Sequence, residues 1–594
     1  MKKNSIGKMI RNVSKHDPSL FAYFAVNAFS SGFEPVLGVF ALQLIVAQLT
    51  KTNGSLQHVI ITIFAYIFTS TALKIIATQS DQRSWGRFAY LRMEYLRNIC
   101  SKLLTMDYAY YENPSFFNEK ESVFEAVSGN NLGLEGIYHR LFSIAGKLVT
   151  ILTLSIIISL FHPVIVIVML VSVITSVLAM RKTSQFRHAK KPELNQADRR
   201  VSRLYESSAN FEYGKDIRLF DLKGRFLEVF RKEIDNFKEV YTLIVNREFT
   251  LSHLPAFVSA VAEFVMYVVL TFGVLNGLSI AHFTMYMVSV TLLSAKMREA
   301  AIDIGFIRDQ LLYVDDMYEF IDTNLITENS DQPFCATTPV KIEFVDVSFQ
   351  YPNTKRWVLQ NFNLTIEPSE KLALVGVNGG GKTTIVKLLS GMYRPTKGKI
   401  LINGVDYLDM ILADLQGLIA MVSQEVQPLA FSVAENVAAS ETYDRKRVEE
   451  CLRRVGLWEK ISSHPKDIET SLLKILDEEG IVLSGGENQK LMIARALYKQ
   501  GTQMMIMDEP TAALDALAEE KIYREMNDIM QGKTAIFISH RIASTRFCDR
   551  IVLLDGGNIK ETGTHDELMA AGGLYREMFE VQAKYYRESM EEAV

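Results

Sequence analysis

A glycine-rich segment, Gly376-Val-Asn-Gly-Gly-Gly-Lys-Thr-Thr384, has the composition and spacing of a loop that binds nucleotide phosphates. It follows the apolar run 372–375 and precedes the apolar run 385–389, so we expect a strand to enter the loop and a helix to leave it. Glycines let successive backbone N–H groups turn toward phosphate oxygens, and the start of the helix adds the positive end of its dipole. The expected phosphate-binding residues are Gly376, Asn378, Gly379, Gly380, Gly381, Lys382, Thr383 and Thr384, with Lys382 on the β- and γ-phosphates and the Thr383 hydroxyl on Mg²⁺.

Three further segments follow this loop in a fixed order. One of them ends an apolar run with two carboxylates, Asp508 and Glu509. A carboxylate at the end of a strand can hold the water shell of a metal ion, and the next carboxylate can polarise an attacking water as a general base. Phosphoryl transfer needs mainly such positioning and charge. The three segments are Leu483-Ser-Gly-Gly-Glu487, Met504-Met-Ile-Met-Asp-Glu509 and Ala535-Ile-Phe-Ile-Ser-His540.

Together these motifs resemble the nucleotide-binding domain of ATP-binding cassette (ABC) proteins, over residues 341 to about 582. The resemblance implies that ATP and Mg²⁺ are the cofactors and that the domain hydrolyses ATP. It implies that Glu509 is the general base, assisted by Lys382, and that His540 contacts the γ-phosphate and orients the water. Asp508 and Gln424, together with Thr383, are then expected to hold Mg²⁺.

The resemblance also implies contacts to the base and to a second chain. Tyr351, in Phe349-Gln-Tyr-Pro352, is expected to stack on adenine, although a surface aromatic is an alternative. Asp515 is expected in the loop that couples two facing sites. Ser484, Gly485 and Gly486 are expected to bind ATP held by the other chain. Glu487 departs from the family, which has Gln there, and we interpret it as a mild variant.

The first half of the chain is expected to lie in a membrane. A bilayer core about 30 Å thick is crossed by ~20 helical residues. Hydrophobic residues make up 48% of the chain, and the apolar surplus precedes the ATPase motifs. Six apolar runs predict six spans, at about 19–50, 56–78, 141–161, 163–180, 249–276 and 279–295.

The basic residues predict the orientation of these spans. Five of them, Lys2, Lys3, Lys8, Arg11 and Lys15, precede the first run, and the long segments 81–140 and 181–248 are rich in Lys and Arg. Because positively charged loops stay inside, both termini and both long segments are predicted to be cytoplasmic. We expect a multi-pass protein of the cell membrane, in a bacterium.

Six spans followed by one such ATPase domain resemble an exporter-type ABC half-transporter. The expected fold class is a polytopic α-helical membrane domain followed by an α/β P-loop ATPase domain. We divide the chain into a transmembrane domain (1–322), a linker (323–340) and a nucleotide-binding domain (341–594). The long segments are expected to carry coupling helices at about 114–127 and 211–220.

This resemblance implies ATP-driven export by alternating access, in a dimer with a second half-transporter. A homodimer is favoured because Glu509, His540 and Ser484 are all present, and a heterodimer remains open. Residues 477–489 and 512–520 are similar to bacterial exporters of modified peptides and bacteriocins, which favours a peptide cargo. A lipid or drug exporter, or a nucleotide-gated channel or regulator, is the alternative. The predicted spans exclude a soluble ABC ATPase, and a net charge of −4 does not suggest nucleic acid.

Two carboxylates inside predicted spans, Glu34 and Glu263, are candidates for the substrate path. Carboxylates in a membrane are costly and are rarely exposed to lipid. One interpretation is that they line the substrate path and favour a cationic or amphipathic cargo. Membrane lipid is a further expected partner of these spans. The alternative is an internal pair, with Lys74 or Lys147, or a protonated side chain that is hydrogen-bonded to Ser or Thr.

Overall fold

The computed structural model describes residues 4–51, 55–113, 116, 122–327, 332–377, 379–424, 427–475, 477–510, 527, 530, 532–539 and 542–591. The chain forms two compact units. The first contains Met1–Thr105 and Ser115–Thr323, and the second contains Met106–Pro114 and Asn324–Val594. The sequence-based division assigned residues 106–114 to the transmembrane domain and residues 323–340 to a separate linker, whereas the structure joins residues 106–114 and 324–340 to the second unit.

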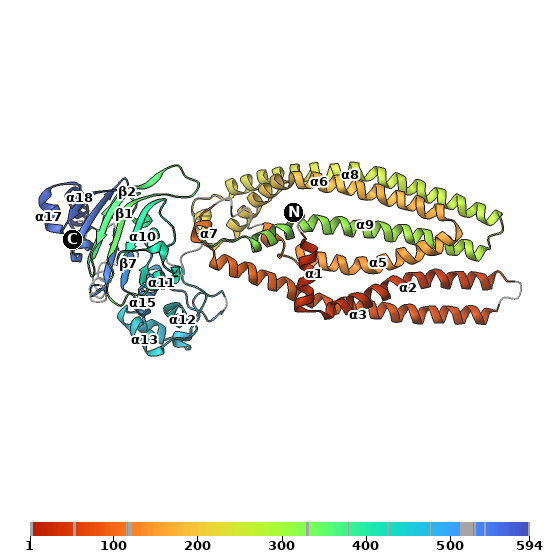
Figure 1. The fold of residues 1–594 in the computed structure, drawn as a ribbon, viewed down its shortest axis with the longest axis horizontal. Coiled ribbons are helices and arrows are strands. Elements are labelled where there is room, and N and C mark those ends of the chain that lie inside the picture. Colours follow the sequence, from red (N-terminus) through yellow and green to blue (C-terminus); the bar gives the residue numbers. More distant parts are fainter. Residues whose placement is uncertain are drawn as a thin grey trace. The chain divides into compact units, whose positions relative to one another are not determined.

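The regular elements of the first unit are all helices in its described part (Figure 1). Its six longest helices have between 29 and 53 residues, and each predicted apolar run matches part of one of them to within one residue at its ends. The short helix α7 coincides with the second predicted coupling segment, whereas much of the first, 114–127, lies outside the described residues. The helices are α1 (Ser5–His16), α2 (Ser19–Leu49), α3 (Leu56–Thr105), α5 (Gly133–Phe161), α6 (Pro163–Ala209), α7 (Phe211–Leu219), α8 (Lys223–Leu275) and α9 (Ile280–Asp322).

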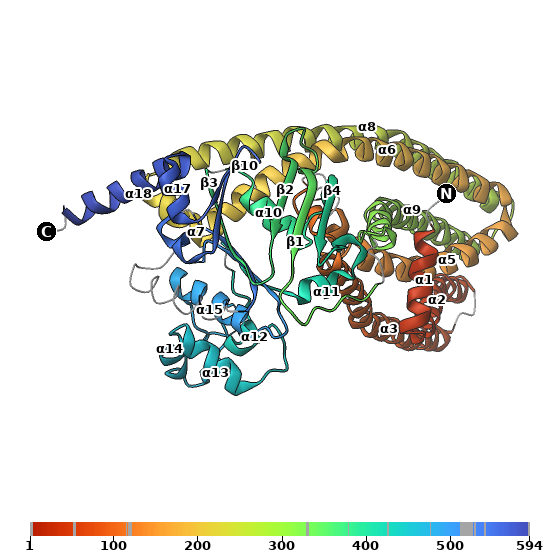
Figure 2. The ribbon, with the colours of Figure 1, turned by 60° about the vertical axis from the view of Figure 1, so that its left-hand side comes forward.

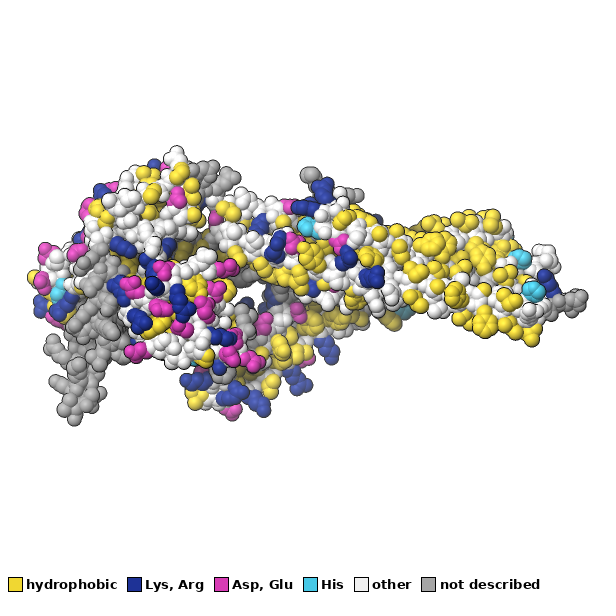
Figure 3. Space-filling model, turned by 90° about the horizontal axis from the view of Figure 1, so that it is seen from below, with side chains coloured by type: hydrophobic (Ala, Val, Ile, Leu, Met, Phe, Trp, Pro, Cys, Tyr) yellow, Lys and Arg dark blue, Asp and Glu magenta, His cyan; other side chains and the backbone are white. Residues whose placement is uncertain are grey.

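Five helices of this unit, α2, α3, α5, α6 and α8, are long and apolar enough to cross a membrane. Figure 3 shows apolar side chains gathered over the part of the unit near the short interhelical connections. The chain is therefore a multi-pass membrane protein. The helix α9 begins at the sixth predicted run, but its composition does not place it among these five helices. That α9 crosses the membrane therefore remains a prediction.

The long helices pack in pairs, α2 along α3 and α6 along α8, with α5 beside α9 (Figures 1 and 2). Small residues allow α2 and α5 to approach closely. A Cβ on Gly146 would lie 2.0 Å from the Ser31 hydroxyl oxygen, and the Thr150 hydroxyl donates a 2.8 Å hydrogen bond to the Gly32 carbonyl. Close packing of small residues and hydrogen bonds between helices usually hold helices together in a membrane, where the hydrophobic effect does not drive their association.

The second unit combines two sheets with helices (Figure 2). One sheet is antiparallel, in the order β2-β1-β4-β5. The other has the order β10-β9-β3-β8-β7-β6, with parallel pairing except at the edge strand β10. The strands are β1 (Ile342–Gln350), β2 (Trp357–Ile366), β3 (Lys371–Gly376), β4 (Lys397–Ile402), β5 (Val405–Asp406), β6 (Ile419–Val422), β7 (Met504–Asp508), β8 (Thr534–Ile538), β9 (Arg550–Asp555) and β10 (Asn558–Gly563).

Two apolar cores hold this unit together. One joins the antiparallel sheet, β3 and α10, and includes Phe344, Leu374 and Ile385. The other lies among α12, α13, α15 and the parallel strands. The helices are α10 (Lys382–Leu389), α11 (Leu412–Gly417), α12 (Val433–Ala438), α13 (Arg445–Arg454), α14 (Trp458–Ser462), α15 (Gly485–Tyr498), α17 (His565–Ala571) and α18 (Leu574–Glu591), with 3-10 turns at Tyr108–Tyr110, Tyr407–Asp409, Asp467–Glu469 and Ile542–Phe547.

Residues 106–113 are held in this second unit by hydrogen bonds. The backbone N–H of Asp107 donates to the Leu325 carbonyl at 3.0 Å. The Glu112 carboxylate accepts a 2.6 Å bond from Lys387 Nζ on α10 and another from the Tyr393 hydroxyl. A segment that directly follows α3 in the chain is thus fixed to the helix that leaves the phosphate loop.

Candidate ATP site

The phosphate loop has the predicted strand–loop–helix arrangement. Strand β3 ends at Gly376, and α10 begins at Lys382 after Gly381 as its N-cap. Gly376 has φ +141°, and a Cβ there would lie 2.0 Å from the Leu554 carbonyl oxygen, so the position requires glycine. The N-terminal backbone N–H groups of α10 and the positive end of its dipole are thereby available to phosphate oxygens.

Lys382 lies within this loop, and its side chain is buried. Its ammonium group donates to the carbonyls of Gly376 at 2.8 Å and Val377 at 3.2 Å. Burial lowers its pKa, and the nearby carboxylates of Glu509 and Asp508 oppose that shift. The lysine is therefore held next to the carboxylates that are predicted to complete the catalytic site.

The two carboxylates lie at the end of β7, as predicted. Asp508 is buried, and burial together with the charge of Glu509 raises its pKa to about 6. Glu509 has φ +50°, an uncommon backbone conformation for a residue other than glycine. The Gln424 amide donates a 3.0 Å hydrogen bond to the Glu509 carboxylate, and the Gln489 amide donates to the Glu509 carbonyl at 3.1 Å. The predicted base and the predicted loop glutamine are therefore in direct contact.

One cavity of ≈ 970 Å³ brings most of the predicted residues together. Tyr351 borders it, and its hydroxyl lies 3.0 Å from the Thr384 hydroxyl. The sequence reasoning missed Arg356 and Trp357, which follow Tyr351 after a turn with Asn353 at φ +62°. The turn signal Pro352-Asn353 could have identified them as neighbours of Tyr351 in the cavity wall. The lining residues are Tyr351, Arg356, Trp357, Val358, Gly379, Gly380, Gly381, Lys382, Thr383, Thr384, Gln424, Asp508, Glu509, Ile538 and Gly556.

The residues fit a magnesium nucleotide. A buried carboxylate, a hydroxyl and an amide, from Asp508, Thr383 and Gln424, border the same cavity as the phosphate loop, and oxygen donors suit Mg²⁺. No group of three or more His, Cys, Asp and Glu that could hold a metal ion occurs among the described residues.

The Ser484 segment does not line this cavity within the described part of the chain. Ser484 is the N-cap of α15, and the Ser484 and Glu487 side chains form a reciprocal capping box. Lys460 Nζ contacts both oxygens of Glu487 at 2.8 Å. Burial alone would raise the pKa of Glu487, but the hydrogen bonds from Lys460 and Ser484 outweigh burial and lower it. The pattern Ser-x-x-Glu is a capping signal that the sequence reasoning overlooked.

Three predicted residues, Asn378, Asp515 and His540, lie outside the described residues. Their roles therefore remain predictions.

The two carboxylates predicted within the membrane both have partners. Glu34 accepts a 2.6 Å hydrogen bond from the Ser70 hydroxyl and lies 3.1 Å from Lys74 Nζ. Glu263 contacts the Ser294 hydroxyl at 3.0 Å and Arg298 Nη1 at 3.1 Å. These contacts favour the alternative of internal pairs, although Arg298 was not among the partners named.

Comparison with known proteins places the second unit in a class. The family model described as ABC transporter matches residues 359–512, which include the phosphate loop, Gln424, the Ser484 segment and both carboxylates. This part of the chain is therefore an ABC transporter ATPase domain, and nucleotide binding follows from it.

Individual relatives extend the comparison. The ATP-dependent lipid A-core flippase of Burkholderia pseudomallei is 38% identical over 268 residues, which is 45% of this chain and 44% of that protein. The flippase of Paraburkholderia xenovorans is 40% identical over 244 residues, or 41% and 40% of the two chains. The chain thus aligns with less than half the length of these flippases.

Two further relatives span nearly the whole chain. The subtilin transport ATP-binding protein SpaT of Bacillus subtilis is 25% identical over 583 residues, covering 97% of this chain and 93% of that protein. A solved structure of a bacterial Atm1-family ABC exporter with ATP bound has a TM-score of 0.79 at 22% identity, covering 95% and 100% of the two chains. The chain therefore has the ABC exporter fold, with helical and ATPase parts in one polypeptide, and the predicted fold class is confirmed.

Proposed function

We propose that this protein is one half of a dimeric ABC exporter that hydrolyses Mg²⁺-ATP and moves its cargo outward by alternating access. The observation that carries the proposal is one cavity that holds Lys382, Gln424, Asp508 and Glu509, in a chain with five candidate membrane spans. The Ser484 segment does not line this cavity in the described part of the chain, which fits a site completed by a second chain. A homodimer is the simplest arrangement, since Glu509 and Ser484 are both present.

When bound, Mg²⁺ would lower the barrier by neutralising charge on the transferred phosphate. The residues of this chain would position the phosphates and the attacking water. Lys382 and the α10 N-terminus would bind phosphate oxygens, and Glu509, next to Gln424, would accept the proton of the attacking water. Binding of ATP to only one of two conformations is sufficient to drive alternating access.

We also propose that the protein lies in the cell membrane of a bacterium, with both termini in the cytoplasm. The basic segments before the first span and after the second and fourth spans support this orientation. The subtilin transport relative aligns over nearly the whole chain and supports a peptide cargo, whereas the partial alignment with the flippases keeps a lipid cargo as the alternative.

Replacement of Glu509 by Gln tests the ATPase role. We expect turnover to fall ~100-fold or more, because the general base is lost, while ATP binding persists through the phosphate loop. Glu441→Gln, an exposed change in the same unit, is the matched control and should leave turnover unchanged. ATP turnover and binding are measured on the purified full-length protein in lipid nanodiscs. Wild-type turnover in Glu509→Gln would refute the assignment.

A further inference from the structure

Three ion pairs of the helical unit share a feature that the sequence did not reveal. In each pair the acid is the more buried partner and the base the more exposed one. A cation that a less exposed carboxylate holds in place presents its remaining donors outward. The exposed fractions of the side chains are 16% and 65% for Glu34 and Lys74, 34% and 51% for Glu263 and Arg298, and 1% and 45% for Asp303 and Arg140.

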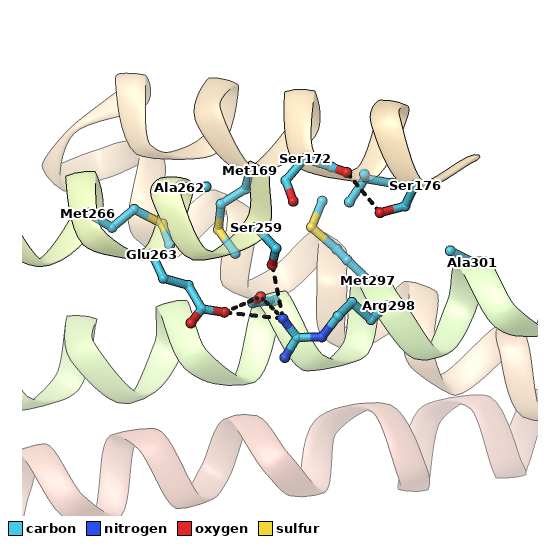
Figure 4. A pocket seen from close by; sticks show the side chains of 12 residues that line it. Met169, Ser172, Ser176, Ser259, Ala262, Glu263, Met266, Met297, Arg298 and Ala301 are labelled. Atoms are coloured by element: carbon cyan, nitrogen blue, oxygen red, sulfur yellow. Dashed lines mark hydrogen bonds and ion pairs between the residues drawn. The ribbon is translucent and has the colours of Figure 1, made fainter. Parts of the chain in front are cut away.

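The pair Glu263–Arg298 lies in a small pocket between α6, α8 and α9 (Figure 4). Arg298 Nη1 contacts the Ser259 hydroxyl at 3.2 Å, the Ser294 hydroxyl at 2.9 Å and Glu263 Oε1 at 3.1 Å. The pocket of ≈ 20 Å³ has room for a water molecule but not for a cargo. It therefore fixes the arginine, and any larger ligand must bind on its outer side.

The outer side of Arg298 has unused donors. The contacts that Figure 4 draws for Arg298 all involve Nη1, and Nε and Nη2 donate to none of the described residues. These two nitrogens lie along one edge of the guanidinium. Two parallel N–H donors match the two oxygens of a carboxylate or a phosphate. Glu263 also has a second oxygen, Oε2, without a partner among these residues, but its charge is already compensated by Arg298.

The depth of the site indicates the kind of molecule. Arg298 lies eighteen residues after the start of α9 at Ile280, which is ~27 Å of helix. In a bilayer core about 30 Å thick, that is close to the cytoplasmic boundary, where the headgroups of amphiphiles lie.

We propose that Arg298 binds the anionic group of an amphipathic cargo, a carboxylate or a phosphate ester, and that Glu263 positions the guanidinium. The inference rests on the proposed exporter function, and it reverses the sign of the cargo charge expected from Glu34 and Glu263 alone.

Native mass spectrometry of the purified full-length protein tests the site without ATP. The probes are phosphatidylglycerol, which is anionic, and phosphatidylcholine, which has no net charge. The wild type is expected to retain phosphatidylglycerol preferentially, and Arg298→Gln is expected to reduce that preference about tenfold, because one charge and two donors are lost. Arg298→Lys, which keeps the charge but not the paired donors, should fall between them.

The sign of the Glu263→Gln effect separates the two cargo hypotheses. Glutamine still accepts a hydrogen bond from Arg298 but removes a negative charge, so retention of phosphatidylglycerol should rise several-fold. A site for cationic cargo predicts no such gain. Arg225→Gln, in an exposed pair with Glu228 near the start of α8, is the matched control and should change nothing.

Either of two results would overturn the proposal: an unchanged lipid preference in Arg298→Gln, or a weaker one in Glu263→Gln. Displacement of the lipid by inorganic phosphate would show that a free anion, not a headgroup, is the ligand, and would overturn the amphipathic part. Wild-type protein that binds lipid selectively but hydrolyses no ATP would instead refute the proposed exporter function.

Discussion

A double-mutant cycle can measure the contact between Glu112 and Lys387. The two side chains are 2.6 Å apart, and Tyr393 donates to the same carboxylate. The Lys387 ammonium group also lies between 5.6 and 5.8 Å from the ring centres of Tyr108, Tyr351 and Tyr393. The perturbations are Glu112→Gln, Lys387→Met and the two together.

The expected coupling free energy follows from the exposed fractions of the two side chains. The Lys387 side chain is 22% exposed and that of Glu112 is 36% exposed. Charged hydrogen bonds contribute about 1.5–3 kcal/mol when buried, and exposed ion pairs about 0–1 kcal/mol. We expect a coupling free energy of roughly 1 kcal/mol, between these limits. For a unit of this size that is a shift of about 2 °C in the unfolding midpoint.

The pH dependence has a defined sign. Burial would raise the pKa of Glu112, but the bonds from Lys387 and Tyr393 outweigh it and lower that pKa. Burial would lower the pKa of Lys387, and the bond to Glu112 outweighs it and raises that pKa. The contribution of Glu112 is therefore complete above the ordinary glutamate pKa of about 4.3 and is lost as the pH falls through its lower folded value. The difference between wild type and Glu112→Gln should be constant near neutral pH and should shrink in acid.

The assay is thermal unfolding of the full-length protein, followed by tryptophan fluorescence. Two of the three tryptophans, Trp357 and Trp458, lie in the second unit. Lys387→Met should lower the midpoint in the wild type but hardly in Glu112→Gln. Glu577→Gln, an exposed change on α18, is the control for loss of a surface charge. Equal effects of Lys387→Met in both backgrounds would mean that the pair is not coupled and would refute the reasoning.

Two further predictions concern ion pairs of different burial. Glu487→Gln keeps the capping box with Ser484 but loses the partly exposed pair with Lys460, so stability should fall by about 0–1 kcal/mol while ATP turnover is kept or slightly raised; loss of turnover would show a role for the carboxylate. Arg92→Met leaves the buried carboxylate of Glu135 without its 2.6 Å cation and should cost about 3–5 kcal/mol, whereas addition of Glu135→Leu should restore most of the thermal stability; an equally unstable double variant would contradict this.

The ATP site could be predicted because its parts are local in sequence. The order strand, loop and helix around Lys382 is encoded in contiguous residues, and so is the strand that ends at Asp508. Parallel strands then bring these ends to one edge of the sheet. The contact between Gln424 and Glu509 follows from the same topology, since β6 and β7 are neighbours.

Contacts between distant segments could not be predicted in this way. Glu112 and Lys387 are 275 residues apart, and no local periodicity or motif connects them. The sequence assigned residues 106–114 to the membrane domain because they follow a long span. Their polar and aromatic side chains instead bind to α10 and to Tyr393, an assignment that only the tertiary structure reveals.

The partners of Glu34 and Glu263 show when the partner of a residue in a helical hairpin can be found from the sequence, by counting equal numbers of residues from the connection between the two helices. Glu34 lies fifteen residues before the end of α2 at Leu49, and Ser70 and Lys74 lie fourteen and eighteen residues after the start of α3 at Leu56. Two antiparallel helices joined by a short connection place equal counts at equal depth, so Lys74 could be named from the sequence.

The same count at Glu263, twelve residues before the end of α8 at Leu275, leads to residues near 292 on α9, and Ser294 is indeed a partner. Arg298 begins one turn deeper and reaches back along its own helix, because the long side chain of arginine extends toward a carboxylate that would otherwise be uncompensated. A count of residues along the two helices therefore does not identify Arg298, the residue that brings a positive charge to the pocket. A partly buried carboxylate in a span is evidence for a cation within reach of it, and the chemistry offered to a ligand is that of the more exposed partner.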